Sequence, residues 1–565
     1  MSSLAFPNPS LSARWADPSL YASTARRCLA AFALSALAGC ALAPDPITPE
    51  EHYQRARDDQ SVLEASYLPV KGPLTIEEAI ARALKYNYDA QLAKTEVSLQ
   101  ERQLDLALSQ MLPRIAANAG YNWRNNDNAA ASVSERTKIQ SLEPSFSEEP
   151  GHRTADIQFS WNLLDIGVSY FQAKQQGYRA FVAVERRRKV LDGIVKEVEG
   201  TYWKAMAADK LIPPIEDALA RAERVLEASR QAHKDELQAP LVALDFQQSM
   251  LQVIGQLRRM RNELRSARVQ LATLVNAPPS TELATEPVED PMQIPKVVLD
   301  RSQLEALGLA LRPELREEAY QEKISRQDIY KEMIKMMPAI GILGSLNYDS
   351  NKYLTNNTWG ELGVRATVNL VGIIQGPQAI KMARASVDVA HARRLALSVA
   401  VLTQVNMGFQ NYLNSLDNLE AAARIQKVQQ QIATASNNAS IAQAQSDAER
   451  VRRTLTAMIA EMERYRAIVD LHTTLANLYT AVGIDIVPPS ADFNDLDALT
   501  VQVKQSIADW EAGRLPSIEI PASPAVSGDP AQAPSIAAPP PSQSGDETPK
   551  AISESAGGGI NRPQI

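Results

Sequence analysis

The sequence predicts a mainly α-helical protein that carries two amphipathic β-hairpins and is built as a tandem repeat. The middle of the 565-residue chain is rich in helix-forming residues, and only 5% of all residues are aromatic. This composition is typical of long helices and coiled coils rather than of a large globular core. Two segments, 154–163 and 362–370, alternate apolar and polar residues with the period of a β-strand. The helical pattern around the first segment recurs around the second.

The first 40 residues have the features of an export signal. Two arginines precede the apolar run CLAAFALSAL, and the four residues that end at Cys40 read Leu-Ala-Gly-Cys. We therefore predict a signal peptide over residues 1–39 and, because these four residues resemble a bacterial lipobox, lipidation of Cys40. Ala41, in place of an aspartate, is typical of lipoproteins sorted to the outer membrane. The alternative is an ordinary secretory signal that is cut nearby.

The mature chain should begin with a linker and a helix. Residues 40–73 are polar, contain several prolines and are assigned to the lipid anchor and linker. Thr75 and Glu78 then fit a capping box, and an apolar stripe predicts a helix from there to about Met111. Leu112-Pro113 should end this helix, because proline disfavours helical geometry in the residue before it.

The first hairpin is predicted over residues 114–163. A polar loop over roughly 124–153 joins its two strands, and Gly167 is expected to mark the switch back to helix. The return strand alternates strictly, which gives it one apolar and one polar face. Its apolar positions are Ala155, Ile157, Phe159, Trp161 and Leu163.

A very long helix should follow, from Val168 to about Glu236. At a rise of 1.5 Å per residue it approaches ~100 Å. Two adjacent prolines, Pro213-Pro214, remove two backbone donors and clash with the preceding turn, so a kink or break is expected there. The chain should then reverse at 237–240 and return as a helix that ends near Val275.

The second half of the chain repeats this plan, which we interpret as an internal duplication of residues 74–276 in residues 301–487. A helix broken at Arg312-Pro313 precedes a second hairpin over residues 339–370. The tail at 515–565 is rich in Pro, Ser and Ala and is expected to be disordered.

The second hairpin is followed by a second long helix. Gly372 and Gly376-Pro377 should precede this helix, and the chain should reverse at Asn437–Ser440. A return helix follows and is expected to end at Gly483, so both halves close in the same way.

The four strands indicate a membrane pore. Each has about nine or ten residues, enough to cross a bilayer at a tilt, with one face suited to lipid and the other to a wet lumen. Tyr121, Trp123 and Trp161 are placed to occupy interfacial belts. Residues assigned to the lumen are Asn118, Asn122, Arg124, Asp156, Gln158, Ser160, Asn162, Arg365, Thr367 and Asn369.

A four-stranded sheet cannot sit in lipid alone, because its open edges leave backbone groups unpaired. Single-chain barrels start at eight strands, so two chains or three must combine their strands. A small soluble sheet with one face packed on helices is the alternative.

Several sequence features occur together. They are LTIEEAIARALKYN at 74–87, the Leu-Pro break at 112–113, WNLLDIG at 161–167 and the tandem repeat. In combination they resemble the outer-membrane efflux protein family, the TolC-like channels, in its lipoprotein form. The resemblance implies a homotrimer with a twelve-stranded β-barrel in the outer membrane and a long α-helical barrel in the periplasm. Residues 277–300 and 488–514 would form an equatorial belt around this barrel.

The resemblance also implies a passive exit duct without an active site or cofactor. Its partners would be outer-membrane lipid, a periplasmic adaptor protein and an inner-membrane transporter that supplies the energy. The tips at which the helices reverse would contact the adaptor. These tip residues are Leu237, Gln238, Ala239, Pro240, Asn437, Asn438, Ala439 and Ser440.

The tips depart from the family pattern. Many drug-efflux members carry a Gly-Leu-x-Ser type of turn and place acidic residues just past the second turn. Here the corresponding entrance candidates are Gln443, Gln445 and the first acid, Asp447. Export of a protein or polysaccharide, as in type I secretion, therefore stands beside drug efflux.

Other classes of function fit less well. The net charge of −8 and the lack of a concentrated basic face argue against a nucleic-acid partner. The five histidines lack metal-ligand spacing, and neither a P-loop nor a GxSxG sequence is present, so neither a metal site nor an enzyme is expected. The main competitor is a lipid-anchored coiled-coil tether without a pore, which would not explain two matched hairpins.

Overall fold

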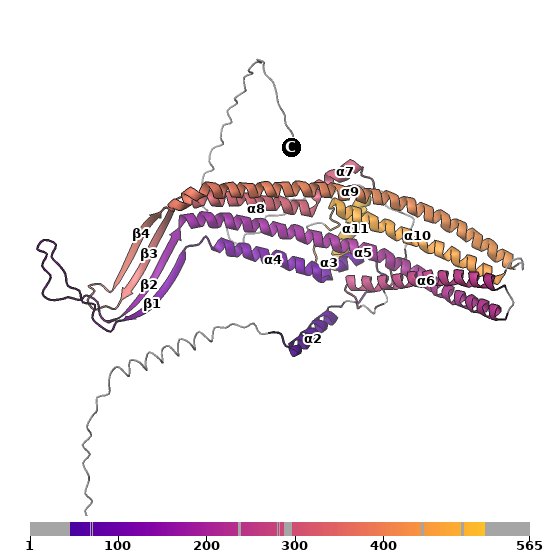
Figure 1. The fold of residues 1–565 in the computed structure, drawn as a ribbon, viewed down its shortest axis with the longest axis horizontal. Helices are drawn as coiled ribbons and strands as arrows, with labels where there is room; N and C mark the ends of the chain where they lie inside the picture. Colours follow the sequence, from indigo (N-terminus) through magenta and orange to yellow (C-terminus); the bar gives the residue numbers. More distant parts are fainter. Residues whose placement is uncertain are drawn as a thin grey trace, which may run out of the picture.

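The computed structural model describes residues 46–512 and 514, apart from positions 68, 71, 236–238, 279–280, 282, 288–296, 442–445 and 488–490. This part of the chain is strongly elongated, with a four-stranded sheet at one end and helices along the remaining length (Figure 1). The predicted fold class, mainly helical with four strands, is confirmed. The predicted signal peptide, Cys40 and the C-terminal tail lie outside the described residues.

The two halves of the chain repeat each other element by element. The first half contains α3 (Ile76–Tyr86), α4 (Tyr88–Ser109), β1 (Arg114–Trp123), β2 (Gly151–Asn162), α5 (Leu163–Lys234) and α6 (Pro240–Leu274). The second half contains α7 (Arg301–Leu311), α8 (Pro313–Lys335), β3 (Ala339–Asp349), β4 (Thr358–Thr367), α9 (Leu370–Ile441) and α10 (Asp447–Val482). Helices α5 and α9 both have 72 residues, and α6 and α10 have 35 and 36.

The sheet joins the two halves. Its strands are all antiparallel and lie in the order β1-β2-β3-β4, so the central contact pairs β2 of the first half with β3 of the second. In that contact Ile157 lies opposite Leu346. Strands β1 and β4 are the two edges, and each has one side without a partner strand in the described chain.

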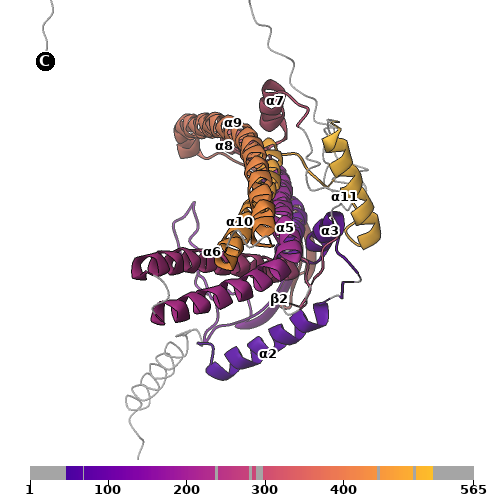
Figure 2. The ribbon, with the colours of Figure 1, turned by 90° about the vertical axis from the view of Figure 1, so that its right-hand side faces the viewer.

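Three apolar cores hold the helices together. At mid-length, α3 and α11 (Leu496–Glu511) pack on α5 around Leu74, Ile80 and Val198, and Figure 2 shows these two short helices on the flank of the long ones. Towards the tips, α5, α6 and α10 share a core that includes Met250 and Leu455. The third core lies among α7, α8, α9 and α10. Burial along the whole length explains how such long helices remain ordered.

A kink or a break was predicted at Pro213-Pro214, and the break is wrong, because α5 continues through both prolines. The two rings lie on the exposed side of the helix, while Ile212 and Ile215 are buried against α6 and α10. Solvent can therefore reach the carbonyl groups that lose their helical donors, and packing on either side keeps the helix continuous.

The predicted linker contains a helix, α2 (Pro49–Ser66), which was missed. Thr48 and Glu51 form a capping box, with Thr48 N–H donating to Glu51 Oε2 over 2.7 Å. No residue of α2 is buried, and Figures 1 and 2 show it standing apart from the long helices. Its last residue meets the body, since Asn276 Nδ2 donates to the Ser66 carbonyl over 3.0 Å.

The helix predicted from Thr75 to Met111 is divided into α3 and α4 by Asn87, whose backbone is extended. Asn87 Oδ1 accepts a hydrogen bond from Asp89 N over 2.7 Å, so a side chain replaces the missing helical contact. Helix α11 was also not predicted.

The switches from strand to helix come earlier than predicted. Helix α5 begins at Leu163 rather than after Gly167, and α9 begins at Leu370 with Pro377 inside it. Strand β4 accordingly covers Thr358–Thr367 instead of 362–370. The second reversal is also displaced, because Asn437–Ser440 belong to the last turns of α9, which ends at Ile441.

Both return helices are closed by a residue in left-handed geometry. Asn276 has φ of 54° after α6, and Gly483 has φ of 75° after α10, where a helix end was predicted. A Cβ atom at Gly483 would lie 2.8 Å from the backbone of Arg312. Glycine is therefore required there by space as well as by backbone geometry.

Candidate functional site

The register of the sheet determines which side chains share a face. Asn118 pairs with Asp156, and Asp156 pairs in turn with Asn347. Asn118 Nδ2 donates to Asp156 Oδ2 over 2.9 Å, so this row of polar side chains lies on one side. Alternate residues along each strand belong to the same side. We call this side the polar face.

The polar face carries most of the residues predicted to line a pore. By register these are Asn118, Asn122, Asp156, Gln158, Ser160, Arg365 and Thr367. It also carries polar residues that were not predicted, namely Arg114, His152, Thr154, Ser345, Asn347, Asp349 and Glu361. Alternation is weak in β3, where glycine and leucine interrupt the polar positions, and Glu361 precedes the predicted start of its strand.

Three of the predicted pore residues have other positions. Asn162 Oδ1 accepts from Leu164 N and Asn369 Oδ1 from Gly372 N, each over 3.0 Å, so both asparagines cap the long helices. Asn162 is still the last residue of β2, but Asn369 lies beyond β4. Arg124 follows β1, and its N–H donates to the Pro150 carbonyl over 2.7 Å.

Charges are arranged in order along the polar face. Arg114 and Arg365 lie nearest the helices. Glu361 lies four residues from Arg365 along β4, a distance of ~13 Å at the rise of a strand. Trp359 Nε1 donates to Glu361 Oε1 over 2.7 Å, and Asp156 lies in the neighbouring row. Cationic and anionic levels therefore follow each other across the sheet.

The opposite side is the apolar face. Its residues are strongly exposed in the single chain, with Leu362 85%, Val364 74% and Ile115 71% accessible. Packing on helices would bury them, so the alternative of a small soluble sheet covered on one face does not fit. Among the strand residues of this face, Arg153 is the one that carries a charge.

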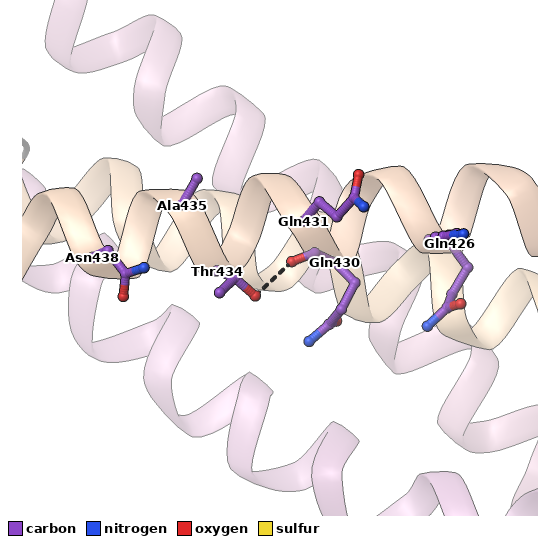
Figure 3. Close-up of a pocket in the computed structure, with 7 residues that line it drawn as sticks. Gln426, Gln430, Gln431, Thr434, Ala435 and Asn438 are labelled. Carbon is purple, nitrogen blue, oxygen red and sulfur yellow. Dashed lines mark hydrogen bonds between the residues drawn. The ribbon is translucent and has the colours of Figure 1, made fainter.

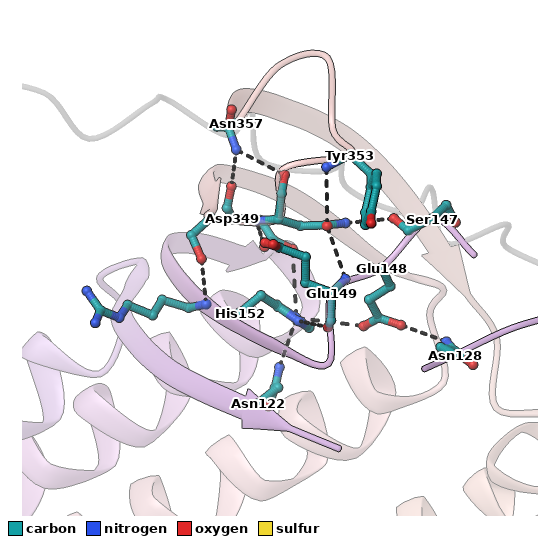
Figure 4. Close-up of polar contacts among 12 residues, drawn as sticks. Asn122, Asn128, Ser147, Glu148, Glu149, His152, Asp349, Tyr353 and Asn357 are labelled. Carbon is teal, nitrogen blue, oxygen red and sulfur yellow. Dashed lines mark hydrogen bonds and ion pairs between the residues drawn. The ribbon is translucent and has the colours of Figure 1, made fainter. Parts of the chain in front are cut away.

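A polar network ties the loops together at the end of the sheet away from the helices (Figure 4). Asn351, which is buried, donates from Nδ2 to the Ser147 carbonyl and accepts from Glu149 N. His152 is buried beside it, and its Nε2 lies 3.7 Å from Glu148 Oε1 and 4.0 Å from Asp349 Oδ2. Loop 124–150 is thus held at its base to the loop after β3.

Where the sheet joins the helices, two buried glutamines of α5 bind its neighbours. Gln175 Nε2 donates to the Ile324 carbonyl of α8 over 2.9 Å. Gln176 Nε2 donates to Gln100 and Gln103 of α4 over 2.9 and 3.0 Å. These hydrogen bonds fix the axial position of α5 relative to α4 and α8.

A second buried network lies at mid-length. Arg188 binds Glu185 over 2.7 Å and Asp485 over 2.8 Å, and Arg316 binds Glu185 over 3.0 Å. Burial raises the pKa of Glu185 and of Asp485 above their usual values despite these arginines. The network links α5, α8 and the segment after α10.

Two further titratable groups are buried with no charged partner close by among the described residues. Burial raises the pKa of Glu199 to about 8. Burial lowers the pKa of His472 to about 4, and its ring stacks on Trp203 with 3.6 Å between centroids. The stacking packs His472 of α10 against α5.

The tips are only partly described. Gln443 and Gln445 lie outside the described residues, as do Leu237 and Gln238. Ala239 precedes α6 and Pro240 is its first residue, while Asp447 opens α10. Leu241 and Val242 next to the first tip are exposed.

Helix α9 presents a polar surface, mostly of amide side chains, towards the second tip. Figure 3 shows Gln426, Gln430, Thr434 and Asn438 along it, and Thr434 Oγ1 donates to the Gln430 carbonyl over 2.9 Å. With Lys427, Gln431 and Ala435 these residues line a shallow groove of about 490 Å³. Asn438, one of the residues predicted to contact the adaptor, lies in this groove.

Among the helices that the structure describes, none is both long and apolar enough to cross a membrane. Within the same residues no three His, Cys, Asp or Glu side chains are grouped so that they could hold a metal ion.

Comparison with solved structures shows the same fold in several channels. The Campylobacter jejuni CmeC outer membrane channel gives a TM-score of 0.58 at 12% identity, covering 76% of this chain and 89% of CmeC. The outer-membrane channel OprN gives 0.57 at 14%, covering 72% and 89%. CusC gives 0.57 at 15%, covering 74% and 95%. A search of curated protein sequences gives no match.

These likenesses define the class of fold, that of the TolC-like channels. Residues 79–277 match the family model described as outer membrane efflux protein. This match identifies that segment as an outer membrane efflux protein domain, as the sequence motifs within it predicted. The family consists of channel proteins rather than enzymes.

Proposed function

We propose that the chain is one subunit of a homotrimeric exit duct in the outer membrane, which conducts substrate passively from a periplasmic pump complex to the exterior. The observation that carries this proposal is the amphipathic sheet with two open edges. Strand β4 of one copy would pair with β1 of the next, and three copies would close a twelve-stranded barrel. Closure satisfies the backbone groups that lipid cannot.

The two faces of the sheet support this orientation. The apolar face is exposed along all four strands and would meet lipid, and the polar face with its charges would line the lumen. Arg114, Asp156, Asp349, Glu361 and Arg365 would then be among the charged groups that an ion meets inside the barrel.

The helices carry their own surfaces for a neighbouring copy. Leu92, Leu99 and Leu106 of α4 are exposed and follow each other at intervals of seven residues, as in a coiled-coil seam. Met382 and Val389 of α9 repeat this interval in the second half. Burial of these stripes between subunits would build the helical barrel.

The partners follow from the family. An adaptor would engage the tips around Pro240 and Asn438, and an inner-membrane transporter would supply the energy. Cys40 would anchor each subunit by lipid at the periplasmic side of the outer membrane, and the loop 124–150 would face outward. The groove on α9, lined mostly by amide and hydroxyl side chains with Lys427 as its one charged residue, suits an adaptor that binds mainly through hydrogen bonds.

The test is the conductance of the purified protein in planar bilayers, together with its mass by light scattering. A duct gives discrete channels and a trimer, whereas a coiled-coil tether gives no conductance. The substitution Leu99→Glu should prevent trimer formation, because it places a charge in the seam. Lys94→Glu on the same helix, also exposed but off the stripe, is the control and should leave the trimer intact.

A further inference from the structure

We propose that Arg153, together with Tyr121 and Tyr348, binds the phosphate group of a glycolipid in the outer leaflet. The proposal rests on the proposed function, because it takes the apolar face of the sheet to be the lipid-facing one. It adds a ligand site on the outside of the barrel that is separate from the conduction path.

The first observation is the position of Arg153 in the register. Arg153 pairs with Tyr121 of β1. Ala155, two residues after Arg153 along β2, pairs with Tyr348 of β3. These pairs belong to the apolar face, on the opposite side from His152. A cation on a lipid-facing surface is unfavourable at the midplane and becomes tolerable near the interface.

The second observation is that its guanidinium group is available. Arg153 is exposed, and its side chain forms no ion pair or hydrogen bond with any residue of the described ranges. Its backbone, in contrast, is held at both polar groups. The N–H donates to Ser350 Oγ over 2.8 Å, and the carbonyl accepts from Ser350 N over 2.9 Å. The backbone that carries the cation is therefore fixed, while the guanidinium group has no counter-ion among the described residues.

The third observation is a shallow hollow of about 630 Å³ around this side chain. It is lined by Ala119, Gly120, Tyr121, Arg153, Thr154, Ala155 and Tyr348. Gly151 leaves room for the first tyrosine, since a Cβ atom there would lie 2.8 Å from the Tyr121 hydroxyl. An arginine fork flanked by tyrosine hydroxyls offers several donors to phosphate oxygens.

The depth of the hollow fits a lipid headgroup. Arg153 lies near the end of β2 that is remote from α5, and Ala155, Ile157 and Phe159 follow it towards the helices. Tyr121, Trp123 and Tyr348 surround it at the level where aromatic residues mark the interface. With the helices in the periplasm, this level is the outer leaflet.

The joining strand of a neighbouring subunit carries no counter-ion on this face. The strand that would join β1 is β4 of the next copy, and its outer residues on the apolar face are Thr358 and Gly360, which are uncharged. The anion must therefore come from outside the barrel strands. Phosphorylated glycolipid is the anion present at that depth, so charge and position agree.

The experiment uses the detergent-purified full-length trimer and counts bound lipid by native mass spectrometry. Lipid A with both phosphates should bind the wild-type protein at up to one molecule per subunit. Arg153→Gln should weaken this binding about tenfold, the loss of one charge-assisted fork. Tyr121→Phe and Tyr348→Phe should have smaller effects. Arg365→Gln removes an arginine from the other face of the sheet and is the matched control, which should bind as the wild type does.

Three results would overturn the proposal. They are unchanged lipid A binding by Arg153→Gln, equal binding of lipid A whose phosphates have been removed, and full displacement of lipid A by millimolar orthophosphate, which would indicate a simple anion site. Conductance of the same samples separates the two proposals. A conducting wild type without phosphate preference refutes the lipid site alone, whereas a protein that neither trimerises nor conducts refutes the exit duct.

Discussion

Replacement of Glu199 by glutamine should make the protein more stable at high pH while changing little at low pH. Glu199 is buried on α5, and burial raises its pKa from 4.5 to about 8. For a carboxyl group whose pKa is raised by folding, the contribution to the free energy of unfolding is fully present below pH 4.5, the pKa in the unfolded chain. That advantage is lost as the pH rises towards 8, because only the unfolded chain can ionise readily.

The magnitude follows from the same shift. A shift of one pKa unit corresponds to about 1.4 kcal/mol, so the wild type should lose about 3 kcal/mol per chain between pH 4.5 and 7. Between pH 5 and 8.5 the loss should be about 4 kcal/mol. Glutamine has nearly the same shape and does not ionise, so Glu199→Gln should show none of this slope. The buried His472 titrates in both proteins, and its contribution cancels in the difference.

The assay is chemical unfolding followed by helical ellipticity, at pH 5 and pH 8.5 and at one fixed protein concentration. The midpoint of Glu199→Gln should exceed that of the wild type by far more at pH 8.5 than at pH 5. Glu197→Gln changes an exposed residue of the same helix and is the control. Its difference in midpoint from the wild type should be the same at both pH values. An equal difference at both pH values would show that Glu199 is not a neutral buried acid.

Further substitutions test the sheet and its junction with the helices. In planar bilayers, Glu361→Gln should shift the reversal potential towards anion selectivity and Arg365→Gln towards cation selectivity; shifts of the same sign would contradict a shared polar lumen. Gln176→Leu removes three hydrogen bonds to α4 and to its own helix, so the unfolding free energy should fall by about 2 kcal/mol, and an unchanged unfolding midpoint would refute this. Asn369→Ala should cost about 1 kcal/mol by loss of the N-cap, measurable by thermal unfolding, while Asn369→Asp should retain most of it.

The fold could be predicted from the sequence because the patterns that indicate it are local and occur in both halves of the chain. Strict alternation in β2 predicted both faces of that strand, and the Leu-Pro pair before β1 correctly ended the preceding helix. The duplication then reinforced each assignment, since an ambiguous element in one half had a counterpart in the other. Equal lengths of α5 and α9 show how closely the halves correspond.

The errors have two physical origins. The prediction at Pro213-Pro214 relied on the intrinsic tendency of proline to break helices. Packing of α5 against two other helices outweighs that tendency. Helix α2 was missed although Thr48, Pro49 and Glu51 form a clear start signal, because its polar residues show no apolar stripe. A helix that buries nothing leaves little periodicity to detect.

The candidate pore shows the same division between local and non-local information. Alternation within β2 identifies Asp156 and Gln158 as neighbours on one face, but only the register shows that Glu361 and Arg365 of a distant strand share it. The central pairing of β2 with β3 is fixed by contacts between segments that lie far apart in the sequence, which no local pattern encodes. A slip of one residue in that pairing would exchange the two faces of a strand. Arg153 would then enter the lumen, and the lipid site and the ion selectivity would be lost together.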